Sequence, residues 1–210
     1  MSIIKIIFWG IVAILVFNYL NPKDTTFDET ITLPVNTKIV AFGDSITYGY
    51  RVDNDKNYPS VLANLLQVKV INAGVNGELS KNGLQRLPSI LTKYKPDILI
   101  ICEGGNDILQ RKNLTKTKEN IAKMIELAQS KKIQVVLIGV PDVEFLTLST
   151  ASFYQELADK YNVPLDDSSL EEILNDDTLK IDTVHPNAKG YKILSNNLAQ
   201  IISNSYIPVI

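Results

Sequence analysis

The stretch Lys38-Ile39-Val40-Ala41-Phe42-Gly43-Asp44-Ser45 joins a strand-like apolar run to a short polar turn. Lys38–Gly43 predicts a first β-strand, and the Gly-Asp-Ser sequence marks its end. Open parallel α/β sheets present their chemistry at the carboxyl ends of the strands, so Ser45 stands where a functional side chain is expected. A lone serine is ordinarily a surface or capping residue, so its role depends on what the rest of the chain supplies.

Four more strands are predicted, in alternation with helices. Their near-continuous β-branched or leucine runs suit strands buried on both faces of a parallel sheet, and they cover Val68–Asn72, Asp97–Glu103, Ile133–Val140 and Val163–Leu165. Apolar residues recurring three and four positions apart predict helices over 58–65, 84–94, 121–128 and 154–161, and a last helix from Pro186 to Ile201. Pro88 is expected to divide the second helix into a turn and a helix. The alternation is typical of a doubly wound α/β/α sandwich with a five-stranded sheet.

The composition excludes several functional classes. The 210 residues, 45% hydrophobic and 21% charged, suit one globular domain with a short appendage. A net charge of −2, with no basic cluster beyond pairs such as Lys131-Lys132, argues against nucleic acid or another polyanion as the main partner. The single cysteine, Cys102, excludes an intrachain disulfide framework and a multi-cysteine metal site, and its apolar surroundings predict a buried thiol.

The N-terminal residues predict a membrane segment. Eighteen residues from Ile3 to Leu20, mostly apolar, nearly span a hydrocarbon core of about 30 Å at a rise of about 1.5 Å per residue. A cleavable signal peptide is the alternative, but the residues from Phe17 to Pro22 lack the small side chains of a cleavage site. We therefore predict a signal-anchor or signal peptide over residues 1–21, a tether over 22–37 and a globular domain over 38–210. The domain is expected outside the cytoplasm, in the periplasm or at the cell surface, anchored in the inner or plasma membrane by residues 3–20.

The only histidine, His185, is a candidate base for Ser45. Asp182 precedes it by three residues, so one short loop can bring the carboxylate to the imidazole. A serine hydroxyl needs a general base to become a nucleophile, and the base needs a partner that fixes its tautomer. Ser45, His185 and Asp182 therefore predict a catalytic triad.

Acyl transfer also requires hydrogen-bond donors for the developing oxyanion. The candidates are the backbone amides of Ser45 and Gly74 and the side-chain amide of Asn106, all of which follow predicted strands. Other motifs are not indicated. Ser45 lacks the second glycine of a Gly-x-Ser-x-Gly elbow, Gly104–Asp107 is not a Walker loop, and one histidine leaves metal catalysis unsupported.

Four blocks together resemble the SGNH (GDSL-type) hydrolases: Gly43-Asp44-Ser45, Gly74, Gly105-Asn106-Asp107 and Asp182-x-x-His185. The resemblance runs from about residue 38 to 204 and is closest to the bacterial periplasmic thioesterase/lysophospholipase branch, often called arylesterases. It implies a flavodoxin-like three-layer fold and hydrolysis of esters or thioesters through an acyl-enzyme, without metal or cofactor. It also implies that Ser45 is the nucleophile, His185 the base and Asp182 its partner, with an oxyanion hole formed by Ser45, Gly74 and Asn106.

The leading hypothesis is a monomeric, membrane-tethered serine esterase acting on short-chain acyl or aryl esters, thioesters or lysophospholipids. The segment from Val140 to Leu148 departs from that branch, and we expect it to cover the acyl pocket. An O-acetyl esterase of cell-surface glycans would use the same triad. A non-catalytic binding module and a flavodoxin-type nucleotide binder share the fold and remain alternatives.

Overall fold

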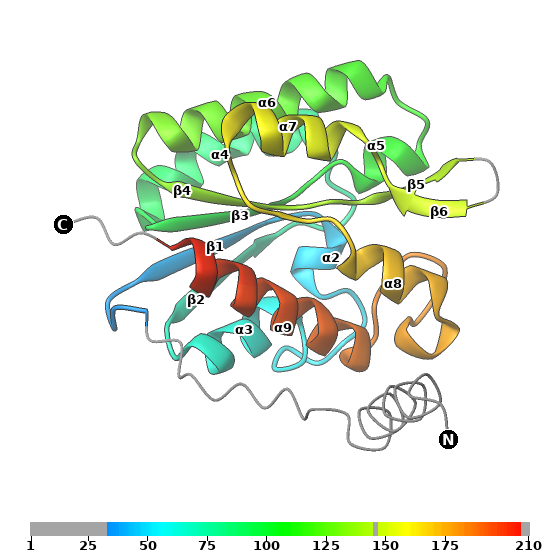
Figure 1. The fold of residues 1–210 in the computed structure, drawn as a ribbon, viewed down its shortest axis with the longest axis horizontal. Helices are drawn as coiled ribbons and strands as arrows, with labels where there is room; N and C mark the ends of the chain where they lie inside the picture. The colour runs from blue at the N-terminus through cyan, green and yellow to red at the C-terminus, as the bar shows by residue number, and fades with distance from the viewer. Residues whose placement is uncertain (1–32, 145–146, 207–210) are drawn as a thin grey trace, which may run out of the picture. The chain divides into compact units, whose positions relative to one another are not determined.

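A computed structural model of the chain describes residues 33–144 and 147–206. Its centre is a five-stranded parallel sheet in the order β2-β1-β3-β4-β7, which is the order of flavodoxin-like folds (Figure 1). The strands are β1 Lys38–Gly43, β2 Lys69–Gly74, β3 Ile98–Cys102, β4 Gln134–Ile138 and β7 Leu165–Asp166. The predicted α/β fold with a five-stranded parallel sheet is confirmed, and β1 has the predicted bounds.

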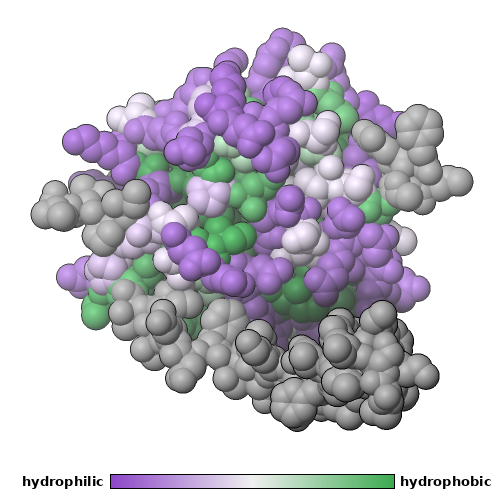
Figure 2. All heavy atoms as spheres, viewed as in Figure 1, coloured by the Kyte–Doolittle hydropathy of each residue, from purple (hydrophilic) through white to green (hydrophobic). Residues whose placement is uncertain are grey.

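Helices cover both faces of the sheet. Figure 1 shows α4 Ser80–Tyr94, α6 Leu114–Ser130 and α7 Phe153–Tyr161 on one side, and α3 Tyr58–Leu66 and α9 Ala188–Ser205 on the other. Their apolar stripes form the core, as in α6, which buries Ile121, Met124, Ile125 and Ala128. Hydrophilic residues cover most of the visible outer surface, and hydrophobic residues show mainly between the two helical layers (Figure 2). Cys102 is fully buried in β3, as predicted.

Small elements follow the carboxyl ends of the strands and were not predicted. They are the helices α2 Ser45–Tyr48, α5 Gly105–Leu109 and α8 Ser169–Asn175, the 3₁₀ turn Asp177–Leu179, and a hairpin of β5 Pro141–Glu144 and β6 Thr147–Thr150. All except α8 are too short to show a periodic pattern in the sequence, whereas α8 repeats apolar residues at Leu170, Ile173 and Leu174 and was overlooked. They lie together at the right of the sheet in Figure 1.

Several predicted helix boundaries were wrong, since α4 already begins at Ser80 and α6 spans Leu114–Ser130. Helix α4 continues through Pro88, because Leu87 and Leu91 are buried on either side of it. Burying two leucines contributes about 3–6 kcal/mol, which offsets the roughly 3 kcal/mol cost of an interior proline. Helix α9 begins at Ala188 and not at Pro186, because the Asn187 side chain caps it by accepting hydrogen bonds from the N–H groups of residues 189 and 190.

The predicted membrane segment, residues 3–20, and most of the tether lie outside the described residues. Within residues 33–144 and 147–206, no helix is both long and apolar enough to cross a membrane.

Candidate active site

Ser45 lies where β1 passes into α2, at the carboxyl edge of the sheet. Gly43 makes this turn possible, since a Cβ atom there would lie 2.2 Å from the Cys102 carbonyl oxygen of β3. The Asp44 carboxylate accepts a hydrogen bond from the Ile46 N–H at 2.9 Å and so caps the short helix. Ser45 is thereby held as the first residue of α2, with a partly exposed side chain.

The three residues of the predicted triad are in contact, although Ser45 and His185 are 140 positions apart in the chain. His185 Nε2 lies 3.0 Å from Ser45 Oγ. On the other side of the ring, Nδ1 lies 2.9 and 3.0 Å from the two carboxylate oxygens of Asp182. This is the geometry in which a base can take a proton from serine while a carboxylate fixes its orientation.

The Asp182 carboxylate is also bonded to the backbone of its own loop. Its Oδ1 accepts hydrogen bonds from the N–H groups of Val184 and His185, each at 3.0 Å. Partial burial acts to raise the pKa of Asp182, but these hydrogen bonds and the imidazole hold it below its ordinary value. Asp182 therefore stays ionised beside His185 as the pH falls.

Tyr50 is a site residue whose role the sequence did not reveal. Its ring packs on the His185 imidazole with a centroid separation of 4.7 Å and a tilt of 42°. An aromatic face beside an imidazole restricts its rotation and stabilises positive charge on it. The Arg51 guanidinium lies 5.3 Å from the centroid of the same ring.

The predicted oxyanion donors differ in whether their N–H groups already bind an acceptor in the protein. The Ser45 N–H has no hydrogen-bond acceptor among the described residues. Asn106 Nδ2 donates to Asp44 Oδ2 at 3.1 Å and to the Glu78 carbonyl oxygen at 3.0 Å. The Gly74 N–H donates to Asn72 Oδ1 at 2.9 Å, so this predicted donor is already engaged.

Gly74 has a packing role instead. A Cβ atom on it would lie 2.1 Å from the backbone nitrogen of Tyr48, so only glycine lets β2 approach α2 this closely. Gly77, three residues later, has open space around it and a φ of 73°. Its N–H has no acceptor among the described residues, and its neighbour Glu78 contacts Asn106 through the carbonyl oxygen. The sequence showed two glycines in this loop but not which amide is free.

Buried acidic side chains lie behind the oxyanion side of the site. Burial raises the pKa of Asp44 to about 7. Neither carboxyl oxygen of Glu103 accepts a hydrogen bond from a donor, and the Glu78 carboxyl is the group that contacts it. Burial raises the pKa of Glu103 well above its ordinary value, and the nearby Asp44 and Glu78 carboxyls raise it further. Arg86 neutralises Glu78 from the other side, with its Nε 3.0 Å from Glu78 Oε1.

Asp107 fixes the helix that carries Asn106. Its carboxylate accepts hydrogen bonds from the Ser80 N–H and hydroxyl, both at 2.8 Å, and from the Thr117 hydroxyl at 3.1 Å. These bonds tie α5 to the starts of α4 and α6. Asn106 therefore stands on a rigid support and contacts Asp44, the residue before Ser45. Within the described part of the chain, no group of three or more His, Cys, Asp or Glu side chains is placed to hold a metal ion.

Comparison with known proteins agrees with this geometry. The model of the "GDSL-like Lipase/Acylhydrolase family" matches residues 41–193. An arylesterase of Vibrio mimicus is 31% identical over 173 residues, which cover 78% of this chain and 86% of the relative. The "Thioesterase 1/protease 1/lysophospholipase L1" of Escherichia coli K12 is 27% identical over 169 residues, covering 77% of this chain and 81% of that protein.

Solved structures show the same fold. AlinE4, described as an SGNH-hydrolase family esterase, superposes with a TM-score of 0.64 at 29% identity, covering 84% of this chain and 100% of the other. The psychrotrophic esterase EstA of Pseudoalteromonas superposes with a TM-score of 0.71 at 21% identity, covering 80% of this chain and 98% of that one.

Proposed function

Given that the chain belongs to the GDSL-like lipase/acylhydrolase family and is a serine ester hydrolase, we propose that Ser45, His185 and Asp182 are its catalytic residues. The observation that carries the proposal is the continuous contact from Ser45 Oγ through the imidazole to the Asp182 carboxylate. Ser45 Oγ attacks the ester carbonyl carbon and His185 Nε2 takes the hydroxyl proton. The same nitrogen then returns the proton to the departing alcohol or thiol, which leaves an acyl group on Ser45.

Water completes the reaction by hydrolysing the acyl-enzyme. It gives a proton to His185 Nε2, attacks the acyl carbon, and releases the carboxylic acid as Ser45 recovers its proton. Asp182 supports the imidazolium that forms in both halves of the cycle. Tyr50 packs on the same ring and favours the charged form.

The oxyanion is proposed to bind to the Ser45 N–H and the Asn106 amide. Asn106 must exchange one of its two acceptors for the oxyanion, and Asp44 Oδ2 is the weaker of the two by distance. Gly77 is the better candidate for a third donor, because its N–H is free whereas that of Gly74 is bonded to Asn72. Gly74 would contribute only if that bond opened.

Small acyl and aryl esters are the proposed substrates, with thioesters and lysophospholipids as further candidates named by the relatives. The hairpin formed by β5 and β6 is proposed to cover the acyl pocket. Val140, immediately before it, reaches the site, since its Cγ1 lies 3.4 Å from where a Cβ on Gly105 would be. The alternative of a glycan O-acetyl esterase is not favoured by the relatives.

The proposed organisation is a signal-anchor or signal peptide over residues 1–21, a tether over 22–37 and a hydrolase domain over 38–210. The apolar run from Ile3 to Leu20 supports an N-terminal hydrophobic helix that attaches a monomeric enzyme to the membrane, with the domain in the periplasm or at the cell surface. Whole-cell fractionation tests this. Soluble, processed protein beginning near residue 21 would contradict the anchor.

Replacement of Ser45 by alanine tests the mechanism. The variant should lose at least about a thousandfold in kcat on p-nitrophenyl acetate and butyrate, because no other described group takes over the nucleophile's part. A fluorophosphonate probe should label the unmodified chain and not the variant. Ser89→Ala is the control, since Ser89 is exposed on α4 and away from the triad. Undiminished hydrolysis by the Ser45 variant would rule out this mechanism.

A further inference from the structure

Six lysines that are scattered through the sequence meet at one edge of the folded sheet. The edge is formed by the amino-terminal ends of the strands and the carboxyl-terminal ends of the preceding helices, at the left of Figure 1. The lysines are Lys38, Lys69, Lys93, Lys95, Lys131 and Lys132. We call this surface the basic edge. It is opposite the edge that carries Ser45, because the strands are parallel.

The contacts between the elements bring these lysines close together. Lys38 and Lys69 open β1 and β2 and are direct partners in the strand register. Lys95 and Lys131 line one cavity of about 340 Å³ between the α4–β3 and α6–β4 connections. Lys132 lines the neighbouring cavity, and Ile133 is shared by both. The charges therefore form one surface, although the sequence shows only the pair 131–132.

Few acidic groups oppose them. All six except Lys38 are exposed, and none of the ion pairs found in the described residues includes any of them. The carboxylates on the elements around the edge are Asp97, Glu126 and Asp159. Asp97 accepts the Lys38 backbone N–H at 2.7 Å, and Glu126 accepts the Tyr161 hydroxyl. The basic edge thus carries a net positive charge on a chain whose overall charge is −2.

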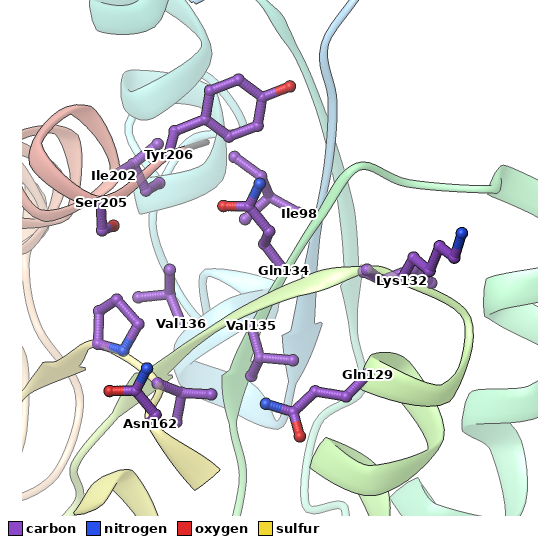
Figure 3. Close-up of a pocket in the computed structure, with 13 residues that line it drawn as sticks. Ile98, Gln129, Lys132, Gln134, Val135, Val136, Asn162, Ile202, Ser205 and Tyr206 are labelled. Carbon is purple, nitrogen blue, oxygen red and sulfur yellow. The ribbon is translucent and has the colours of Figure 1, made fainter. Parts of the chain in front are cut away.

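The surface between the lysines is hollow, and polar side chains such as Gln129 and Asn162 line it together with apolar ones. The larger cavity, about 780 Å³, has a floor that includes Ile98, Val135 and Val136 (Figure 3). Lys132 extends away from the centre of this cavity in the same view. Positive side chains around such a depression suit a lipid surface with anionic headgroups.

The opposite edge carries charges of both signs, because Lys112 and Lys189 are exposed there and the Lys56 and Lys180 side chains pair with carboxylates. Exposed carboxylates surround the active-site end, on the loop before α3 and around α8 and the 3₁₀ turn; they are Asp53, Asp55, Asp167, Asp176 and Asp177. An anionic surface would attract the basic edge, whose lysines take part in none of the ion pairs found in the described residues, more strongly than this end. A chain of small net charge can therefore still be strongly oriented by its charge distribution.

We propose that the basic edge lies against an anionic lipid membrane and that the active site faces away from it. The lysines and the cavity carry the proposal by themselves, and the chain's entry point agrees with it. Residues 33–37 lead into β1 at Lys38, on this same edge, so the proposed N-terminal anchor would attach the domain at the side that binds lipid.

The orientation selects the substrate. β1 has six residues, and at about 3.3 Å per residue Ser45 stands roughly 20 Å from the basic edge. An ester group of a lipid in the same membrane lies too far away to reach Ser45. The enzyme in this orientation takes esters from the aqueous side of the membrane, which favours soluble acyl and aryl esters over lysophospholipids.

Vesicle sedimentation of the full chain tests the proposal. Partitioning into phosphatidylcholine vesicles measures the contribution of the N-terminal segment, and vesicles with 30% phosphatidylglycerol add the headgroup charge. Each lysine at an anionic surface contributes roughly a fivefold gain. The phosphatidylglycerol should therefore raise partitioning at least about tenfold, and 0.5 M NaCl should remove most of this gain.

Two charge-matched variants separate the basic edge from overall charge. The first replaces Lys69, Lys95, Lys131 and Lys132 by glutamine, and the second replaces Lys81, Lys112, Lys189 and Lys192, which are exposed toward the other end of the molecule. The first variant should lose the gain from phosphatidylglycerol while hydrolysing p-nitrophenyl acetate normally, and the second should keep both. Equal partitioning of all three proteins overturns the proposal, as does binding to duplex DNA in place of the vesicles.

The orientation is measured separately with a fluorophore on a single introduced cysteine, since Cys102 is buried. Lys95→Cys should be quenched by headgroup-labelled lipid, and Asp55→Cys should not. The opposite result would place the active site against the membrane and refute the inference, with no bearing on the role of Ser45.

Discussion

The buried Asp44 carboxyl is expected to make the free energy of unfolding depend on pH. Burial, helped by the nearby Glu78 and Asp107 carboxylates, raises the pKa of Asp44 from an ordinary 3.8 to about 7. The folded protein keeps this proton up to about pH 7, whereas the unfolded chain loses it near pH 4. The folded state therefore binds more protons over this range, and its stability falls as the pH rises through it. The full difference corresponds to about 4 kcal/mol.

Asp44→Asn removes this titration. The asparagine oxygen can still accept the Ile46 N–H, which the carboxylate binds at 2.9 Å, so the helix cap is retained. Between pH 5 and pH 8 the wild-type chain should lose about 3 kcal/mol more stability than the variant. Urea unfolding followed by circular dichroism at each pH measures this difference. The slope of the unfolding free energy against urea concentration should be the same at every pH.

Asp55→Asn is the control for this experiment, because Asp55 is exposed and its replacement removes the same charge. It should follow the wild-type pH dependence. Parallel curves for wild type and Asp44→Asn would show that Asp44 is already ionised at pH 5, and the reasoning from burial would fail. Asp44→Asn should also lower kcat, because Asn106 loses the acceptor that orients its amide.

Three shorter predictions concern the residues around the imidazole and the first helix. Asp182→Asn should lower kcat on p-nitrophenyl acetate about 10²–10⁴-fold, since His185 loses the partner that fixes its tautomer; a loss below tenfold would show that other acceptors suffice. Tyr50→Leu should lower kcat about fivefold to thirtyfold and Tyr50→Phe less than twofold, because the ring face, not the hydroxyl, contacts the imidazole; equal losses would contradict this. Gly74→Ala should lower the thermal unfolding midpoint strongly, because its Cβ would lie 2.1 Å from the Tyr48 nitrogen, and an unchanged midpoint would refute the packing role.

The sequence was sufficient to predict the sheet and to bring Ser45, Asp182 and His185 together at one edge of it, for a physical reason. Parallel strands bring their carboxyl ends to one edge, so residues that follow different strands can be assigned to one site without knowledge of distances. Ser45 was assigned in this way. Asp182 and His185 were linked by a spacing of three residues, which a single loop can close, and the structure shows the contact.

What the sequence could not reveal depends on packing between distant segments. Gly74 and Gly77 look equally suitable as oxyanion donors until the side chain of Asn72 is seen to occupy one amide and not the other. The raised pKa of Glu103 depends in part on Glu78, which lies near it only because the loop after β2 lies against the end of β3. Pro88 was predicted to break the helix from its local backbone preference alone. The burial of Leu87 and Leu91, which keeps α4 continuous, depends on tertiary packing.

The basic edge is another feature that arises from the packing of distant segments and is not visible in the sequence. A search along the chain finds pairs of lysines and argues against a polyanionic partner. The fold collects those pairs at one edge because each strand begins there after a helix has ended there. Charge patterns in an alternating α/β chain are therefore better judged by position relative to strand ends than by runs in the sequence.

Both ends of the described chain, Leu33 and Tyr206, lie at the edge of the sheet away from Ser45. This arrangement has a practical value for engineering. A fusion partner, an affinity tag or a covalent link to a solid support can be joined at either side without standing in front of Ser45. The domain can thus be displayed on a bead or an electrode with its active site toward the solution, and two such domains joined end to end would keep both sites open.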